Sequence, residues 1–190
     1  MAVSYKENCL VCHLEDGPFR NELQEIGVDV QTLSNTSIEV RRESRLFQSL
    51  QGSARLLPLI RKIISLAKQY DLIYVNTPKA LVVGAIASYF SRCPMIYHLH
   101  DILTPDHFSN NNRQLMVTLA NRFATQIMAV SEAAMNAFIQ AGGRSDIIQV
   151  VYNGFDFEKF QGHNSAGQLL RDKLNVKENF VIGHFSRLSP

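Results

Sequence analysis

Met95-Ile96-Tyr97-His98-Leu99-His100-Asp101 has the pattern of a buried parallel strand that ends in polar side chains. Pro94 stands where a strand can begin, and β-branched and aromatic residues follow it before the chain turns to His and Asp. Ligands of open α/β sheets bind outside the carboxyl ends of the strands. We therefore expect His100 and Asp101 to lie where a ligand would bind.

Apolar segments of the same kind alternate with helical segments along most of the chain. The expected strands are Asn8–Leu14, Val28–Leu33, Asp71–Asn76, Met95–His100, Gln126–Val130 and Ile147–Tyr152. The expected helices are Phe19–Ile26, Ser53–Tyr70, Lys79–Ser91, Gln114–Thr125 and Ser131–Ala141, with Gly142-Gly143 ending the last of them. This order predicts an α/β fold: a Rossmann-like parallel sheet with helices on both faces.

Composition is that of a globular protein and excludes several classes of function. The chain has 190 residues, of which 46% are hydrophobic and 19% charged, and a net charge of +2, too small to indicate a nucleic-acid partner. No apolar run reaches the roughly 18 residues needed to cross a bilayer, and the N-terminus has no hydrophobic signal region. With only three cysteines, we expect a cytoplasmic protein with free thiols.

The character of the sequence changes near its end. Residues 1–160 are expected to form one domain, and residues 161–178 a linker with a short helix at Leu169–Leu174. Residues 179–190 begin a further domain with an apolar strand, Phe180–Phe185. A strand without a partner leaves its backbone groups unpaired, so we expect the remainder of that domain to be absent from this chain.

Four expected strands end in polar residues that would share one edge of the sheet: Asn76-Thr77, His100-Asp101, Ser131-Glu132 and Asn153-Gly154. Thr77 and Ser131 also open helices, whose N-terminal N–H groups favour anions. Each feature has an ordinary interpretation as a helix cap or a turn. Their convergence favours a binding site for a ligand with hydroxyl groups and phosphate.

Two further patterns, a His-x-His and a C-x-x-C, could indicate a metal or redox site but have simpler interpretations. His98 and His100 face the same side of their strand, but no third metal ligand is evident, and His98 is expected to be a satisfied core histidine. Cys9 and Cys12 form a lone C-x-x-C, which favours two buried thiols over a redox or metal site. The absence of G-x-G-x-x-G, Walker A and G-x-S-x-G motifs removes the main support for dinucleotide oxidoreductases, P-loop enzymes and α/β-hydrolases.

The expected helix Ser53–Tyr70 is amphipathic and basic. Its polar side carries Arg55, Arg61, Lys62 and Lys68. Such a helix can lie on an anionic membrane, or it can pack on a sheet with its charges in water. Packing on the sheet is the more ordinary interpretation of this helix, and peripheral contact with the inner membrane face is the alternative.

Taken together, the motifs resemble those of the group-one (family four) retaining glycosyltransferases of GT-B fold. The resemblance rests on these segments: Glu15-Asp16-Gly17-Pro18, Asp71–Asn76, His100-Asp101, Ala129-Val130-Ser131, Asn153-Gly154-Phe155-Asp156 with Phe160, and Arg187-Leu188-Ser189-Pro190. It implies transfer of a sugar from a nucleotide-sugar donor to an acceptor hydroxyl with retention. It further implies no metal and no cofactor beyond the donor as co-substrate, and a sugar, lipid or polysaccharide as acceptor.

The resemblance also assigns roles to individual residues. His100 matches the catalytic histidine that reaches the transferring sugar. Thr77, Asp101 and Ser131 match the acceptor side of the cleft, and Arg187 matches the basic residue that holds the donor diphosphate.

The sequence departs from the family pattern in three places. It lacks the additional first strand with its Gly-rich loop, so we expect an open seam in the sheet, and Ser186 replaces the usual glycine. Most of the donor site would lie beyond Pro190, so the chain alone is expected to be nearly inactive. Two alternatives stay open: a non-catalytic module that pairs with a separate donor-domain chain, and a nucleotide-sugar epimerase.

Overall fold

The computed structural model describes residues 8–13, 17–33, 50–155, 157, 164–176 and 180–182, with side chains described from residue 58 in the first long helix and from residue 167 in the last. The chain divides into two units, Met1–Tyr152 and Asn153–Pro190. The first unit contains a two-stranded and a four-stranded sheet, and the second contains the helix α6 (Asn164–Leu174).

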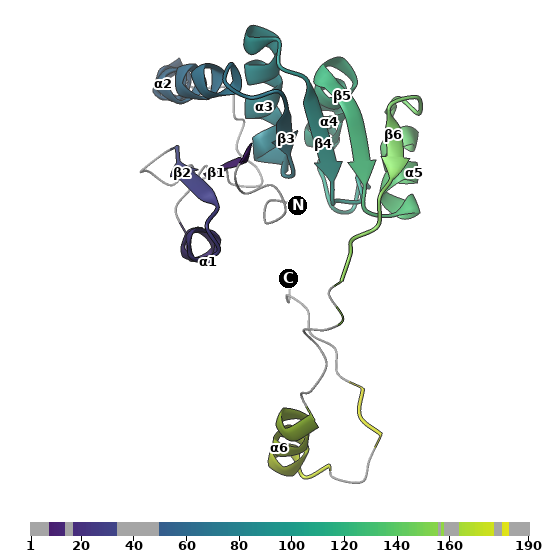
Figure 1. Cartoon of the computed structure of the whole chain (residues 1–190). Helices are drawn as coiled ribbons and strands as arrows, with labels where there is room; N and C mark the ends of the chain where they lie inside the picture. Colours follow the sequence, from purple (N-terminus) through teal and green to yellow (C-terminus); the bar gives the residue numbers. More distant parts are fainter. Residues whose placement is uncertain are drawn as a thin grey trace. The chain divides into compact units, whose positions relative to one another are not determined.

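The four-stranded sheet is parallel, with its strands in chain order (Figure 1). Its strands are β3 (Ile73–Val75), β4 (Met95–Leu99), β5 (Ala124–Ala129) and β6 (Ile148–Val150). The helices α3 (Pro78–Ser91), α4 (Asn110–Phe123) and α5 (Glu132–Gln140) connect them. The predicted Rossmann-like parallel α/β fold is confirmed, but the expectation of connecting helices on both faces of the sheet is wrong.

All three connecting helices pack on one face of this sheet. Each strand is added beside the preceding one in the same direction, and right-handed crossovers then place every helix on the same side. The core on this face includes Leu81 of α3, Val117 of α4 and Phe138 of α5, which pack against Tyr97 and Ile127 of the strands. The opposite face of the strands carries Tyr74, Ile96, His98 and Met128, which are half-buried or exposed.

The remaining elements of the first unit form two smaller groups. The strands β1 (Leu10–His13) and β2 (Asp29–Thr32) pair in parallel around α1 (Phe19–Glu25) and form a sheet of their own. The helix α2 (Leu50–Ala67) packs on α3 through Ala67, Ala87 and Cys93, with Ile63 and Ile64 beside them. In the described part of the chain, no backbone pairing joins the two sheets.

Several predicted boundaries are wrong, including the three that follow. The residues Asn110–Asn112, expected in a loop, form the first turn of α4, because the side chain of Ser109 caps this helix by accepting a hydrogen bond from the Asn112 N–H at 3.4 Å. Residues 164–167, expected in a linker, belong to α6. Residues 180–182, expected to begin a strand, are not a strand and pair with no strand in the described part of the chain.

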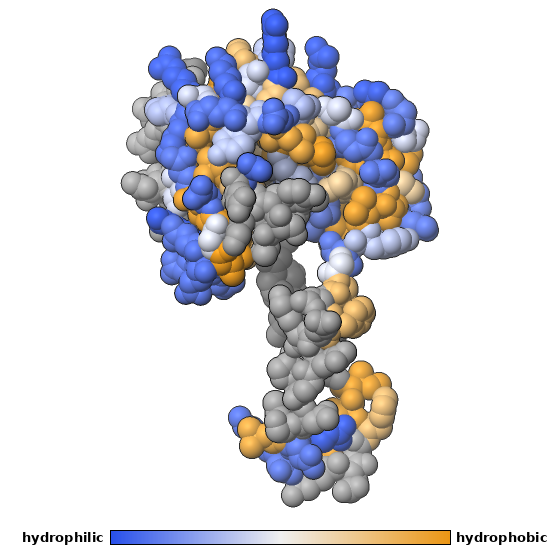
Figure 2. Space-filling model, in the orientation of Figure 1, coloured by the Kyte–Doolittle hydropathy of each residue, from blue (hydrophilic) through white to orange (hydrophobic). Residues whose placement is uncertain are grey.

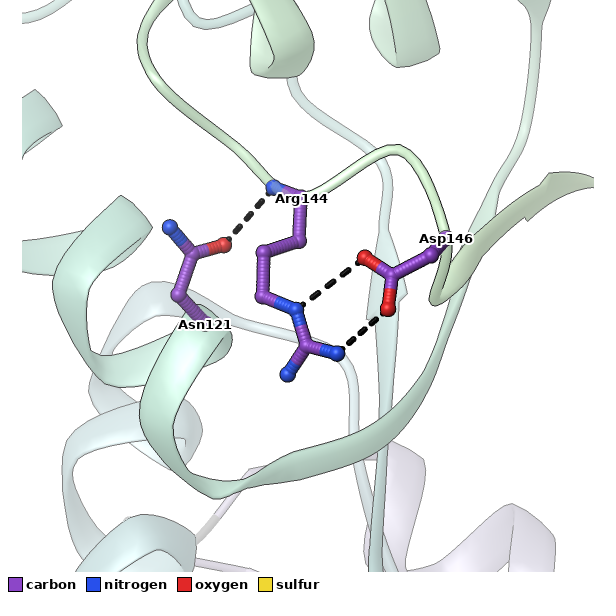
Figure 3. A network of polar contacts seen from close by, with 3 residues as sticks. All are labelled: Asn121, Arg144 and Asp146. Carbon is purple, nitrogen blue, oxygen red and sulfur yellow. Dashed lines mark hydrogen bonds and ion pairs between the residues drawn. The ribbon is translucent and has the colours of Figure 1, made fainter.

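A polar network fixes the loop between α5 and β6 to α4 (Figure 3). The amide nitrogen Nδ2 of Asn121 donates to the Gly142 carbonyl at 2.9 Å, and its Oδ1 accepts from the Arg144 N–H at 2.9 Å. Arg144 also forms a bidentate ion pair with Asp146 at the surface. The Asn121 amide therefore satisfies two backbone groups of the loop that follows α5.

Replacing Asn121 with Ala is expected to lower the free energy of unfolding by about 1–2 kcal/mol, because two backbone groups lose their partner. The measurement is urea denaturation followed by circular dichroism. Asp146→Asn is the control. It removes only an exposed ion pair, so it should change stability less. Equal effects of the two substitutions would contradict the role assigned to Asn121.

Candidate functional site

Three adjacent strands end in predicted site residues at one edge of the sheet. β3, β4 and β5 end at Val75, Leu99 and Ala129, and they are parallel and in register, with Val75 opposite Tyr97 and Leu99 opposite Ala129. Thr77 follows β3, His100 and Asp101 follow β4, and Ser131 follows β5. The structure therefore brings these four predicted residues to the same edge, where the strand arrows end in Figure 1.

Thr77 and Ser131 are both helix caps. The Thr77 hydroxyl accepts from the Ala80 N–H at 3.1 Å, and the Ser131 hydroxyl accepts from the Ala134 N–H at 3.2 Å. A hydroxyl that accepts one hydrogen bond keeps its own proton to donate. Both side chains can thus cap their helices and still donate to a ligand oxygen. Glu132 in the first turn of α5 opposes the binding of an anion there.

His100 is exposed and its ring lies against that of His98. The two ring centroids are 4.1 Å apart, with the planes tilted by 43°. The Nδ1 atom of His98 is hydrogen-bonded to the hydroxyl of Tyr74 on the neighbouring strand. The prediction that His98 and His100 share a side of the strand is confirmed.

His98 is only partly satisfied, in contrast to the core histidine expected from the sequence. Its Nε2 atom is buried and has no hydrogen-bond partner among the described residues. Burial, and secondarily the charge of His100, hold the pKa of His98 below its usual value of 6.5. His98 is therefore neutral at physiological pH and supports His100 as an uncharged aromatic ring.

The lowered pKa of His98 makes the stability of the first unit pH-dependent. His98 takes up its proton at a higher pH in the unfolded chain than in the folded chain. Acidification below about pH 6.5 therefore lowers the free energy of unfolding, whereas above that pH His98 does not lower it. The free energy of unfolding is measured at about pH 7.5 and about pH 5.5. His98→Phe should show a smaller loss than the unsubstituted chain.

The matched control for His98→Phe is the same substitution at the exposed His107. The His107→Phe chain should keep the full loss of stability on acidification. If His98→Phe and the unsubstituted chain lose the same free energy over this range, the proposed effect of burial on His98 is wrong.

The other predicted site residues lie as follows. Asp101 is half-buried, and its negative charge adds to burial in raising the pKa of Tyr97. Arg187 lies outside the described residues, and Asn153 belongs to the second unit. The contact of Tyr74 with His98 could not be predicted from the sequence. Its only signal was an aromatic residue in the strand before the His-x-His pattern.

Two hollows of the described residues lie away from Thr77, His100, Asp101 and Ser131. One of about 330 Å³ is lined by Gly17, Pro18, Arg20 and Asn21, and one of about 250 Å³ lies between the loop at Thr104 and the end of α5. No cluster of three or more His, Cys, Asp or Glu residues suited to a metal ion is found in the described part of the chain. The cysteines are free thiols, but Cys9 is half-buried and Cys12 exposed, so the expectation of two buried thiols there is wrong. None of the described helices is both long and apolar enough to span a bilayer.

The structure is similar to crystal structures of the Anabaena protein Alr3699/HepE. For the complex of that protein with UDP-glucose, the TM-score is 0.83 at 46% sequence identity, covering 100% of this chain and 48% of that one. The complex with UDP and glucose gives the same values, and the complex with UDP gives a TM-score of 0.82 at 45% identity with the same coverage. This chain thus spans about half the length of the solved structures that it matches. A search of curated proteins found no match.

The match to a protein family covers most of the chain. Residues 9–159 match the model of Glycosyltransferase Family 4. This range includes β1 to β6 and the edge that carries Thr77, His100, Asp101 and Ser131. The resemblance to glycosyltransferases seen in the sequence is confirmed, and the chain belongs to Glycosyltransferase Family 4.

Proposed function

We propose that this chain is the acceptor-side part of a glycosyltransferase that moves a sugar from a nucleotide-sugar to a hydroxyl group, with retention at the anomeric carbon. Membership of the family supports this proposal, as does the similarity to a protein that was solved with UDP-glucose and with UDP and glucose. The observation that carries it is the convergence of Thr77, His100 and Ser131 on one edge of a parallel sheet.

In this proposal, His100 contacts the transferring sugar. Its ring is exposed, lies directly after β4 and is supported by His98, so it can form hydrogen bonds with a bound ligand. The hydroxyl groups of Thr77 and Ser131 donate hydrogen bonds to the acceptor substrate. The Asp101 carboxylate accepts hydrogen bonds from the hydroxyl groups of that substrate. Arg187 holds the donor diphosphate, an assignment that rests on the family resemblance alone.

The proposed co-substrate is a nucleotide-sugar, and UDP-glucose is the first donor to test. The acceptor is a sugar, a lipid or a polysaccharide, and the reaction proceeds without a metal or a further cofactor. A donor-binding domain completes the cleft, either from the same polypeptide or from a partner chain.

The test is a chimera in which this chain replaces the matching part of the Anabaena protein. Hydrolysis of UDP-glucose to UDP and glucose is followed by chromatography, with water as the acceptor. The configuration of the released glucose is read by proton NMR before it mutarotates. We expect hydrolysis with the α-anomer released first.

Two results would overturn the proposal in different ways. A folded chimera that binds UDP-glucose but releases no UDP would contradict sugar transfer and favour a non-catalytic module. Release of the β-anomer first would contradict retention and leave transfer intact. The matched control is the Anabaena protein itself under the same conditions.

A further inference from the structure

The amino end of the four-stranded sheet, opposite the site edge, carries an exposed aromatic surface. The turns that lead into β3, β4 and β5 all lie at this end, because the strands are parallel. We call the side chains gathered there the amino-end surface, defined by Tyr70, Leu72, Tyr89, Phe90 and Phe123 with Lys68, Arg92 and Arg122. Tyr89 and Phe90 are 62% and 61% exposed, which is unusual for two consecutive large aromatic residues.

Ring contacts hold the aromatic part of this surface together. The Tyr89 ring lies 5.1 Å from that of Phe90 and 6.1 Å from that of Phe123, both edge to face. Tyr89 and Phe90 come from the end of α3 and Phe123 from the end of α4. The arrangement is thus preformed by two packed helices, and it costs little conformational entropy to present to a partner.

The turn before β3 extends the same surface. The Sγ atom of Cys93 donates to the Tyr70 carbonyl at 3.2 Å, which fixes this turn beside the end of α3. Tyr70 is 38% and Leu72 46% exposed. Figure 2 shows protruding hydrophilic side chains at this upper end of the sheet, with hydrophobic ones between them.

Basic side chains surround the aromatic rings. The Arg122 guanidinium lies 6.0 Å from the centre of the Phe123 ring, and Arg92 caps α3 in a left-handed conformation with φ of 61°. Lys68 is exposed at the end of α2, and the exposed acidic residue of this turn is Asp71. The nearby Arg144 and Asp146 neutralise each other. The described charges of the amino-end surface are therefore mainly positive.

The sequence indicated α2 as a possible membrane contact. Its apolar side, unlike the amino-end surface, is not available for such a contact. The apolar side of α2 is turned to α3 through Ile63, Ile64 and Ala67, so α2 cannot insert it into lipid. The exposed aromatic residues Tyr89 and Phe90 lie at the end of α3 instead, where their rings are accessible to a partner.

We propose that the amino-end surface binds the surface of an anionic lipid bilayer, with Tyr89 and Phe90 in the interfacial region and Arg92, Arg122 and Lys68 on the headgroups. Aromatic rings beside basic residues are the combination that favours the membrane interface. The surface protrudes from helix ends, and neither hollow described above lies on it. Pairing with a second copy about a two-fold axis would bring like charges together.

The test is co-sedimentation of the 190-residue chain with vesicles of phosphatidylcholine alone and of phosphatidylcholine with phosphatidylglycerol. We expect binding to the anionic vesicles, and weaker binding as salt is added. Arg92→Gln and Arg122→Gln should each weaken binding roughly fivefold, the effect of one basic residue near a charged bilayer. Tyr89→Ser with Phe90→Ser should also weaken it, by roughly tenfold, because two interfacial rings are lost.

The controls are Lys79→Gln, at the other end of α3, and Phe19→Ser, on α1. Both remove an exposed side chain of the same type and should leave binding unchanged. Circular dichroism confirms that each variant is folded. Equal effects of control and test variants, equal binding to both vesicle types, or no binding to either would overturn the proposal. Self-association that Phe90→Ser abolishes, without vesicle binding, would identify a second copy as the partner and overturn it too.

Discussion

Replacing Gly143 with Ala should destabilise the first unit by about 3 kcal/mol. A Cβ atom at this position would lie 2.1 Å from the Cδ1 and Cε1 atoms of Phe138 and 2.6 Å from the Phe138 carbonyl oxygen. Phe138 is fully buried and belongs to the main core, so its ring cannot move without repacking the strands. Urea denaturation followed by circular dichroism measures the loss.

The neighbouring Gly142 gives a matched control for this steric effect. It has a φ of 95°, which disfavours side chains, but a Cβ there would meet no atom within 4 Å. Gly142→Ala should therefore cost only about 1 kcal/mol of backbone strain. Similar losses for the two variants would show that the close approach to Phe138 does not limit this turn.

The second large effect is expected for His100. In the chimera with the Anabaena protein, His100→Ala should lower kcat for hydrolysis of UDP-glucose by about 10²–10⁴-fold, the usual contribution of a positioned proton donor or acceptor. KM for UDP-glucose should change less, because most of the donor contacts are proposed to lie elsewhere. Initial rates of UDP release give both constants.

His107→Ala is the control for the chimera, since His107 is an exposed histidine in the loop that follows β4. It should leave kcat and KM near their original values. A variant His100→Ala with unchanged kcat/KM would remove His100 from the proposed site. The remaining evidence for sugar transfer, which is the family and the similarity to the Anabaena protein, would stand.

Local chemistry made most of the fold predictable. Several elements begin or end at residues with one clear role, such as Pro78 at the start of α3 and Gly142 after the end of α5. The ends of several segments were less predictable. Residues 180–182 have the composition of a strand but pair with no strand among the described residues, and Asn110–Asn112 join a helix because Ser109 caps it.

The candidate site was likewise predictable in part from the sequence. The order of strand ends placed Thr77, His100, Asp101 and Ser131 at one edge, since parallel strands share their polarity. The contact between Tyr74 and His98 depends on how β3 aligns with β4, where Tyr74 lies opposite Ile96. The only signal in the sequence for this contact is an aromatic residue in the preceding strand, which does not define the alignment, so the supporting role of His98 became visible only in the structure.

The chain order of the strands in the four-stranded sheet bears on how the molecule acquires its structure. From β4 to β6, every strand pairs with the one that was synthesised just before it. Contacts between segments close in the sequence form quickly, because little loop entropy is lost in closing them. We therefore expect this sheet to assemble step by step as the nascent polypeptide leaves the ribosome, with each new strand and helix docking on a surface already in place.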